Sequence, residues 1–496
     1  MLLRLFLLGV PVERTRLDEL VDEGLRAALA RTALLVEDGD LVHGAARIVP
    51  HDELLIASDQ AGGVEEHADH VPGVHRPSVA LAHLTVRGEG ERALDVGTGN
   101  GIQAILLAAH AEHVVATDVN PRALAYAGFN AALNGVGNVD LREGSFFEPT
   151  AGERFDLVVA NPPYVVSPER ALLFRDSGMA GDAVSEHVVR AAPQALAPGA
   201  FASLLIAWAL DSDDPARRPR EWLSGSGCDA VLLHTSTDDP IETATVWNRD
   251  LLDRPDAYAA ALDRWLAYYR ELGIEQLGYA CLVLRKRTDA RDGTLVARQL
   301  PQAALRPAGR HVRALFETRD RVDEIDAGGT LLDRRLRVVE DAVVSQDVRF
   351  AEGRWHHEAV TLRLERGLPF SAELDPPTAR LVRVLDGTRT LRDALAGATD
   401  DAEARQAGLG RRARDARGRL PRARGVGGQR RKRRTQAASR LATTASAPPR
   451  RSAGTVPRTP THRIPAAVAA ATPIGVSSKT STSAASTPPR CASARR

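Results

Sequence analysis

Apolar runs separated by helix-length segments dominate the chain between about residue 91 and residue 285. The runs predict five strands, at Ala93–Val96, Val114–Thr117, Val139–Glu143, Phe155–Ala160 and Phe201–Ala207, and the segments between them predict helices at Ile102–Ala109, Arg122–Asn134 and Glu186–Leu196. Strands that alternate with helices indicate a mostly parallel sheet with helices on both faces. Uninterrupted apolar runs fit strands that are buried on both sides. We expect Leu277–Leu284 to close this α/β sheet at its far edge.

The first 85 residues have a different pattern. Leu2–Leu8 and Arg16–Arg31 are predicted to be helices, and Ala33–Val42 a hairpin whose Asp38-Gly39 pair suits a tight turn. Helices followed by a hairpin predict a small winged-helix-like domain at 1–85, before the main domain at 86–287. Such a module either recruits a substrate or only packs against the sheet.

Two further segments flank or interrupt the sheet. Residues 211–275 are interpreted as an insertion whose predicted helix, Ala257–Leu272, forms either a lid or part of the core. Residues 288–399 are predicted to be a small α+β module. Its strands are expected at Val338-Val339, Val343-Val344 and Ala359–Leu364, and its helices at Leu381–Leu385 and Leu391–Leu395.

Residues 400–496 lose all apolar periodicity and consist mainly of Arg, Ala, Ser, Thr, Pro and Gly. Such a segment cannot bury enough surface to offset the entropy of ordering it, so it is predicted to be a disordered basic tail. The cluster Arg430-Arg431-Lys432-Arg433-Arg434 leaves open an arm that contacts nucleic acid. A shifted reading frame in GC-rich DNA would give the same residue mixture.

Composition narrows the class of protein. The 496 residues include 44% hydrophobic ones and carry a net charge of +1, so the chain as a whole has no strong attraction to nucleic acid or membrane. No apolar stretch reaches the roughly 20 residues of a membrane span, and the interrupted run Met1–Val10 favours a packed helix over a signal peptide. Three scattered cysteines give neither a disulfide framework nor a zinc site. We therefore expect a cytoplasmic protein.

A glycine-rich turn follows the first predicted strand. Asp95, Gly97, Gly99 and Gly101 alternate with other residues, and the spacing differs from the dinucleotide-binding pattern G-x-G-x-x-G. An acid two residues before the first glycine would repel a pyrophosphate but suits an ammonium and a sulfonium. Asp118, at the end of the second strand, is placed to bind both hydroxyls of a ribose. The alternative is that the glycines only tighten the packing of strand and helix.

These residues resemble the cofactor site of class I methyltransferases. The resemblance implies that S-adenosylmethionine is the cofactor, bound by Asp95, Gly97, Gly99, Gly101 and Asp118. It also places Ser145 and Phe146, after the third strand, against the adenine. Many relatives have aspartate at Ser145. The segment Val71–Ser78 is similar to a loop that covers the methionine end of the cofactor.

Asn161, Pro162, Pro163 and Tyr164 follow the fourth predicted strand. Planar amino nitrogens are poor nucleophiles, so they must be held in line with the methyl group and their N–H bonds must meet acceptors. Asn161 offers a side-chain carbonyl, Pro162 a backbone carbonyl, and Tyr164 a ring that stacks on a flat acceptor. The motif resembles that of methyltransferases acting on exocyclic amino groups and glutamine side chains. Residues Phe174–Asp182 follow where relatives shape the acceptor pocket.

The sequence therefore predicts an S-adenosylmethionine-dependent N-methyltransferase. A nucleic acid base, in ribosomal or transfer RNA, is the first choice of acceptor, and a glutamine of a protein such as a translation release factor is the second. A non-catalytic protein that keeps the fold is a third alternative. We expect no metal site. The segment Trp355-His356-His357-Glu358 lacks the helical His-Glu-x-x-His spacing, and a metal cluster at His67, His70 and His75, in or near the Val71–Ser78 loop, is not favoured.

Overall fold

The computed structural model describes residues 1–60, 68–88, 91–300, 306–326 and 331–398. Residues 1–326 and 339–373 belong to one compact unit, and residues 331–338 and 374–398 belong to a second. No helix in the described ranges is long and apolar enough to cross a membrane. The predicted basic tail at 400–496 lies outside the described residues, as does His67.

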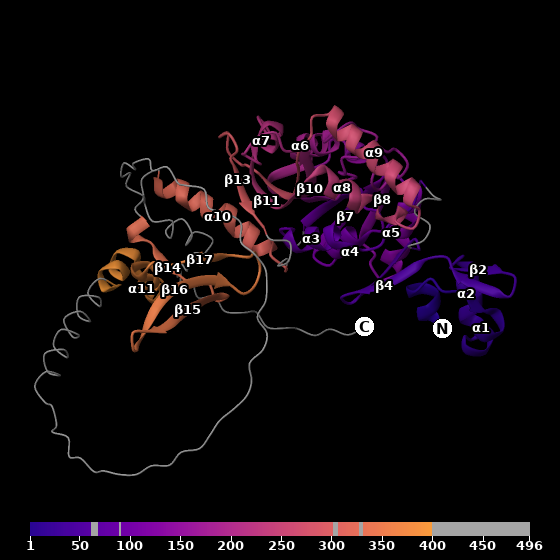
Figure 1. Cartoon of the computed structure of the whole chain (residues 1–496), viewed down its shortest axis with the longest axis horizontal. Helices are drawn as coiled ribbons and strands as arrows, with labels where there is room; N and C mark the ends of the chain where they lie inside the picture. The colour runs from indigo at the N-terminus through magenta and orange to yellow at the C-terminus, as the bar shows by residue number, and fades with distance from the viewer. Residues whose placement is uncertain (61–67, 89–90, 301–305, 327–330, 399–496) are drawn as a thin grey trace, which may run out of the picture. The chain divides into compact units, whose positions relative to one another are not determined.

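An eight-stranded sheet forms the centre of the first unit, with the strand order β13-β11-β12-β10-β9-β6-β7-β8 (Figure 1). The strands are β6 (Glu91–Val96), β7 (Ala111–Asp118), β8 (Val139–Glu143), β9 (Phe155–Ala160), β10 (Leu196–Ala209), β11 (Cys228–Asp238), β12 (Leu277–Lys286) and β13 (Leu295–Gln299). Only β12 runs antiparallel to its neighbours β10 and β11. The predicted mostly parallel α/β sheet is thus confirmed.

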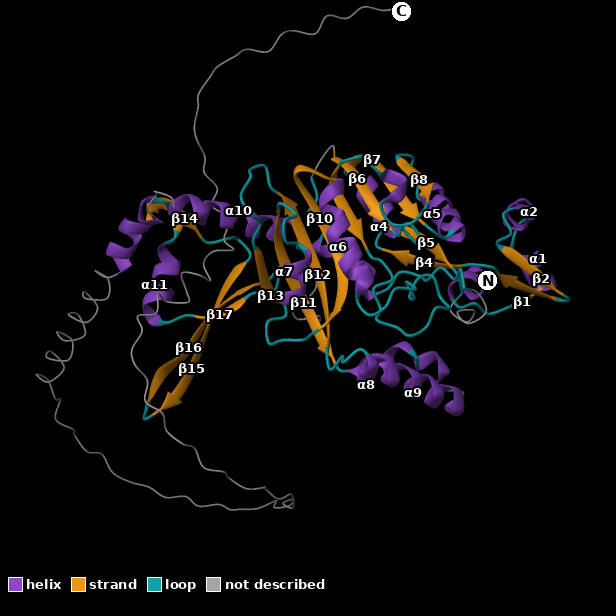
Figure 2. Ribbon diagram, turned by 90° about the horizontal axis from the view of Figure 1, so that it is seen from above, coloured by secondary structure: helices purple, strands orange, loops and turns teal. Residues whose placement is uncertain are grey.

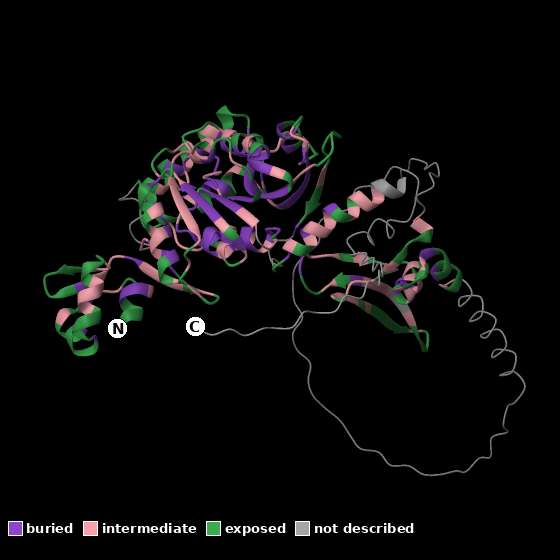
Figure 3. Ribbon diagram, turned by 180° about the vertical axis from the view of Figure 1, so that it is seen from behind, coloured by how far each residue is buried: buried purple, intermediate pink, exposed green. Residues whose placement is uncertain are grey.

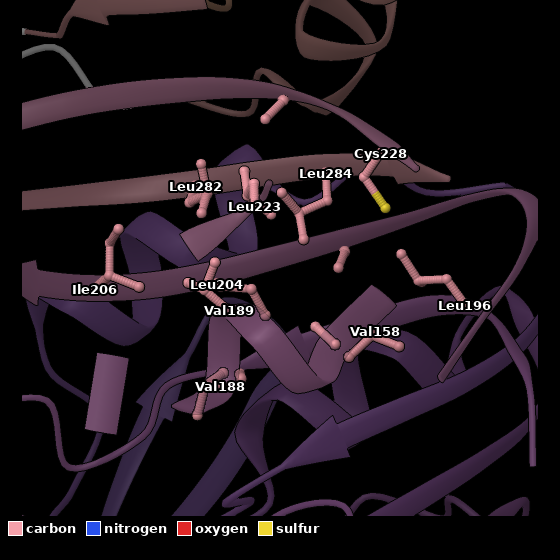
Figure 4. Packing of buried hydrophobic residues seen from close by; sticks show 14 of the residues in the cluster. Val158, Val188, Val189, Leu196, Leu204, Ile206, Leu223, Cys228, Leu282 and Leu284 are labelled. Carbon is pink, nitrogen blue, oxygen red and sulfur yellow. The ribbon is translucent and has the colours of Figure 1, made fainter. Parts of the chain in front are cut away.

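Helices cover both faces of the sheet, as the uninterrupted apolar strands predict. On one face lie α3 (Arg76–Leu84), α4 (Ile102–Ala108) and α10 (Gly309–Asp326); on the other lie α6 (Ala183–Ala195) and α7 (Arg217–Trp222) (Figure 1). Successive residues of β9 point to opposite cores. Val158 packs with Val188 and Leu204 (Figure 4), whereas Leu157 belongs to the cluster on the other face of the sheet. In Figure 3 these strands are the buried centre of the unit.

Two expectations about the last strands were wrong. Leu277–Leu284 does not close the sheet at its edge, because β12 lies between β10 and β11, and β13 forms the edge. Part of the expected insertion at 211–275, Cys228–Asp238, is β11 itself. The rest of it contains α7 and a helical hairpin, α8 (Pro240–Trp247) and α9 (Pro255–Glu271), which lies beyond the ends of β11 and β12 (Figure 2). Strand order depends on pairing between distant segments, which the local pattern does not encode.

The N-terminal segment has its own small core around Leu5, Leu17 and Val42. Its elements are η1 (Leu3–Leu7), β1 (Val12–Glu13), α1 (Arg14–Leu20), α2 (Glu23–Arg31), β2 (Leu35–Asp38) and β3 (Leu41–Gly44). The predicted hairpin is confirmed, with Gly39 at φ +58° in its turn. The single helix expected at Arg16–Arg31 is instead two helices, because the Asp22 side chain accepts the N–H of Leu25 and starts α2.

A second hairpin, β4 (Arg47–His51) and β5 (Leu54–Ser58), joins this segment to the main domain. Two asparagines of α5 (Pro121–Leu133 and its C-cap Asn134) hold it there. Asn130 accepts the N–H of Ala57 at 2.7 Å and donates to its carbonyl at 2.8 Å, and Asn134 makes the same pair of bonds with Leu55. The two side-chain amides thus make the hydrogen bonds to β5 that the backbone of a neighbouring strand would otherwise make.

The C-terminal residues form two small structures. In the first unit, β15 (Ala342–Ala351), β16 (Arg354–Leu364) and β17 (Ser371–Glu373) make an antiparallel sheet. The second unit contains η5 (Leu331–Asp333), β14 (Arg335–Arg337), α11 (Pro376–Val384), β18 (Asp386–Thr390) and helical residues 391–398. Both expected helices are confirmed but are longer than predicted: α11 begins at Pro376 rather than Leu381, and the last helix extends to residue 398. The strand expected at Val338-Val339 ends at Arg337.

Candidate functional site

A cavity of about 340 Å³ lies at the carboxyl ends of β6, β7, β8 and β9. The chain runs outward from β6 through β7 to β8 and then returns to β9 on the other side of β6, so the strand order reverses at this point. Ligands of open α/β sheets bind in the crevice outside the carboxyl ends of the strands at such a reversal. The volume lies within the range of small-molecule sites.

The glycine-rich turn after β6 forms one wall of the cavity. Gly97 at φ +70° and Gly99 at φ +56° line it, and a Cβ atom built on either would meet no atom within 4 Å. Gly101, at φ +84°, does not line the cavity; its Cβ would lie 2.8 Å from the Cα of Ala127 in α5. Two glycines of the motif therefore leave room for a ligand, and the third allows α4 and α5 to pack closely.

Asp118 lies at the end of β7 and lines the cavity. Its two carboxylate oxygens accept the backbone N–H groups of Gly99 and Asn120, each at 2.9 Å. Burial raises the pKa of this carboxyl above its usual value, although both backbone donors act in the opposite direction. A carboxylate accepts up to about four hydrogen bonds, so Asp118 keeps capacity for hydroxyl groups.

Asp95 does not line the cavity, although the sequence analysis expected both acids beside the ligand. Its side chain is 1% exposed and accepts hydrogen bonds from the Thr98 hydroxyl at 2.6 Å and the Ala104 N–H at 3.1 Å. Burial raises the pKa of Asp95 to about 7. Asp95 fixes the glycine-rich turn and the first turn of α4 from inside the protein, and its contact with a cofactor stays a prediction.

Ser145 and Phe146, in the turn after β8, both line the cavity. Phe146 adopts a positive φ of +46°, and its carbonyl accepts the Thr117 hydroxyl at 3.1 Å. Its ring packs against the His187 ring, with 4.9 Å between centroids. The turn therefore holds the Phe146 ring at the cavity wall, where the sequence analysis expected a contact with adenine.

The Asn161–Tyr164 motif begins where β9 ends, and Asn161, Pro162 and Pro163 line the same cavity as Gly97 and Gly99. In the described part of the chain, the Asn161 side chain makes no hydrogen bond. The Pro162 carbonyl accepts the N–H of Tyr164 at 2.7 Å, which closes a tight turn. The amide of Asn161 is thus available to a ligand.

Tyr164 does not line the cavity. It forms a β-bridge with Asp176 and packs with the apolar cluster on one face of the sheet. Burial raises the pKa of its phenol. The expected stacking of Tyr164 on an acceptor is therefore not supported by its position.

The loop before α3 lines the cavity and is held by hydrogen bonds to several other segments. Val71 donates its N–H to Asp59 at 2.8 Å, Asn120 donates to the Asp69 carbonyl at 2.8 Å, and Asn100 donates to the Pro72 carbonyl at 2.9 Å. Residues of the expected loop Val71–Ser78 thus line the cavity. Sequence reasoning missed these three anchors. Asn120 before Pro121 carried a helix-start signal, but Asp59 carried none.

Asp59 is the centre of this attachment. Besides Val71, it accepts hydrogen bonds from Arg122 at 2.5 Å and from the Tyr126 hydroxyl at 2.7 Å. Burial opposes ionisation of Asp59, but the bond from Arg122 and those from Val71 and Tyr126 prevail and lower its pKa. The loop is thereby tied to α5 by an ionised carboxylate.

Residues of the segment Phe174–Asp182, named as acceptor-pocket candidates, also reach the cavity: Phe174, Asp176 and Ser177 line it, together with Leu173. Asp176 accepts the N–H groups of Ala171 and Leu172, each at 3.0 Å, and pairs with Arg175. Its carboxylate therefore shapes the loop. Among the described residues, no group of three or more His, Cys, Asp or Glu side chains is arranged to hold a metal ion.

Comparison with known proteins adds independent findings. Residues 77–207 match the family model described as methyltransferase small domain. The chain is 41% identical over 123 residues to a release factor glutamine methyltransferase of Geobacter sulfurreducens, which covers 22% of this chain and 42% of that protein. It is 35% identical over 225 residues to a release factor glutamine methyltransferase of Deinococcus radiodurans, which covers 40% of this chain and 79% of that protein.

A solved structure, that of Trm5b from Pyrococcus abyssi, is 19% identical with a TM-score of 0.32, over 51% of this chain and 62% of that one. The chain spans less than half the length of the Geobacter relative and more than two thirds of the Deinococcus relative.

Proposed function

Because the chain belongs to the methyltransferase small-domain family of class I S-adenosylmethionine-dependent methyltransferases, we propose that it transfers a methyl group to the side-chain amide nitrogen of a glutamine in a translation release factor. The named activity of its relatives supports this acceptor. These relatives reverse the order expected from the sequence, which placed an RNA base first. None of the relatives described above is named for a nucleic acid substrate.

One observation carries the proposal: the Asn161 amide, unbonded within the described chain, lines the same cavity as Gly97 and Gly99. The open Cβ positions of Gly97 and Gly99 leave room for a ligand to lie close to the backbone, and Asp118 is positioned to accept ribose hydroxyls. Phe146 supplies an apolar surface for a purine ring. The residues present thus fit S-adenosylmethionine.

When bound, S-adenosylmethionine supplies a methyl group on a positively charged sulfur. The chain's own residues must hold the glutamine nitrogen in line with that methyl group. The Asn161 carbonyl is suited to accept one N–H of the glutamine amide, which loosens the lone pair from the carbonyl and offsets the positive charge that develops on nitrogen. The Pro162 carbonyl already accepts the Tyr164 N–H and retains a second lone pair for the other N–H. The displaced proton passes to solvent after the transfer.

The test is transfer of a labelled methyl group by the full chain to purified release factor, transfer RNA and ribosomal RNA in parallel. We expect label in the release factor, at a glutamine. Asn161→Ala should lower kcat by about 10²–10³-fold, the effect of losing one positioned hydrogen bond to the transition state, with little change in cofactor affinity. Asn134→Ala, which removes an amide that does not line the cavity, is the matched control. Label in RNA and none in the release factor would contradict the proposal.

A further inference from the structure

The helical hairpin α8–α9 is attached to the segment that follows the Asn161–Tyr164 motif. Trp265 and Tyr269 of α9 pack with Val165 and Val166 in one apolar cluster. The Tyr269 hydroxyl donates to the Val166 carbonyl at 2.9 Å. The hairpin therefore stands beside the chain segment that presents Asn161.

The hairpin also holds the loop that reaches the acceptor end of the cavity. The Tyr268 hydroxyl accepts the N–H of Gly181 at 2.8 Å, and Arg264 pairs with Glu169 at 2.8 Å. The loop between these two contacts contains Leu173, which lines the cavity and is 45% exposed. One continuous structure thus runs from the cavity rim to α8 and α9, which lie side by side in Figure 2.

The outward surface of the hairpin is both apolar and acidic. Ile241, Val246 and Leu252 are 62%, 55% and 62% exposed. Residues 238–271 carry eight carboxylates against four arginines and no lysine. Asp250, Asp253 and Asp256 are exposed, and the first two lie 3.9 Å from Arg249 and Arg254. We call these three apolar and three acidic side chains the hairpin surface. Exposed apolar side chains beside carboxylates offer a protein partner both surface to bury and charge attraction.

We propose that the hairpin surface docks the methyl-acceptor protein, through a segment of that protein that is basic and partly apolar. This inference rests on the proposed function. A single glutamine side chain offers too few contacts to overcome the loss of translational and rotational freedom, so affinity must come from a second surface. The excess of carboxylates repels the phosphates of RNA and attracts a basic protein segment, which raises the association rate and selects the partner.

The test compares two double variants of the full chain in methyl transfer to the release factor. Ile241→Lys/Val246→Lys removes apolar surface and reduces the net negative charge of the hairpin. Val344→Lys/Val348→Lys makes a matched exchange of two apolar side chains for lysine on β15, where both side chains are 40% or more exposed and neither lines the cavity. We expect the hairpin variant to raise KM for the release factor about tenfold or more, with kcat and S-adenosylmethionine affinity within about twofold of wild type. The β15 variant should match wild type.

Salt provides a second readout. KM of the wild type should rise with ionic strength, and this dependence should weaken in the hairpin variant because its charge attraction is reduced. If wild type methylates the release factor and KM is unchanged in the hairpin variant, or rises equally in the β15 variant, the docking inference is overturned while the proposed function stands. If wild type does not methylate the release factor, both are overturned.

Discussion

Replacing Gly99 and Gly101 separately by alanine tests whether one motif contains a ligand-binding glycine and a packing glycine. Both residues have positive φ, at +56° and +84°, so an alanine costs about 1–2 kcal/mol at either position. The two positions differ in their surroundings. At Gly101 the new Cβ would lie 2.8 Å from the Cα of Ala127, which is backbone and cannot rotate away.

Forcing this atom between α4 and α5 adds roughly 1–3 kcal/mol, the usual cost of overpacking, which gives a total of about 2–5 kcal/mol for Gly101→Ala. For a domain of this size, each kcal/mol lowers Tm by about 2–4 °C. We therefore expect Tm to fall by about 4–20 °C in Gly101→Ala and by about 2–8 °C in Gly99→Ala. At Gly99 the new methyl group projects into space that the cofactor would use.

Thermal denaturation and calorimetry with S-adenosylmethionine on the same preparations give both quantities. Gly99→Ala should weaken cofactor binding at least about tenfold, whereas Gly101→Ala, measured well below its Tm, should stay within about threefold of wild type. A Gly101→Ala variant with unchanged Tm and lost cofactor binding would refute the division of roles between the two glycines.

Three further outcomes follow from buried polar groups. Asn130→Ala leaves both backbone groups of Ala57 unpaired, so it should lower the free energy of unfolding in urea by about 3 kcal/mol, and by more than Asn134→Ala does. Burial raises the pKa of Asp95 from 3.8 to about 7, so the folded state binds the proton more tightly than the unfolded state does. The free energy of unfolding should therefore fall as pH rises between these two values. Asp95→Asn should remove this decline, which is on the order of 4 kcal/mol between pH 4 and pH 8. The pKa of Asp59 is lowered in the folded state, so Asp59 stabilises the fold fully above its ordinary pKa of 3.8. This contribution to the free energy of unfolding is lost as pH falls through the lowered pKa. Asp59→Asn should therefore flatten the acid limb of the stability profile, measured by urea unfolding between pH 2 and pH 6, and an unchanged limb would contradict the role of this carboxylate.

Much of the central domain could be predicted from the sequence. A strand that is buried on both faces must be apolar at every position, so Leu157–Ala160 is visible as a run without any knowledge of its neighbours. A turn with positive φ that leaves room for a ligand beside its backbone needs residues without side chains, so Gly97 and Gly99 are visible in the sequence too. The asparagine and prolines after β9 predicted a methyl-acceptor motif for the same local reason. Each of these features is encoded in a few consecutive residues.

The direction of single side chains was decided only by the tertiary structure. Asp95 and Asp118 both lie at the ends of strands beside the glycine turn, yet Asp95 points into the core below α4 and Asp118 lines the cavity. Gly101 carries the same signal as Gly99, but the nearness of Ala127 gives it a different role. Tyr164 is the last residue of the Asn161–Tyr164 motif, but the turn at Pro162 directs its side chain to the sheet.

Contacts between distant segments were likewise beyond the sequence pattern. Asp59 meets Arg122 and Tyr126 across more than sixty residues, and β11 enters the sheet beside β12 from a segment expected to be an insertion. The apolar and glycine patterns reflect requirements of single positions, such as burial of the side chain or a positive φ. The packing of helices and strands determines which side chains contact each other. It brings together residues that are far apart in the sequence, and the local sequence around one of them does not identify the other.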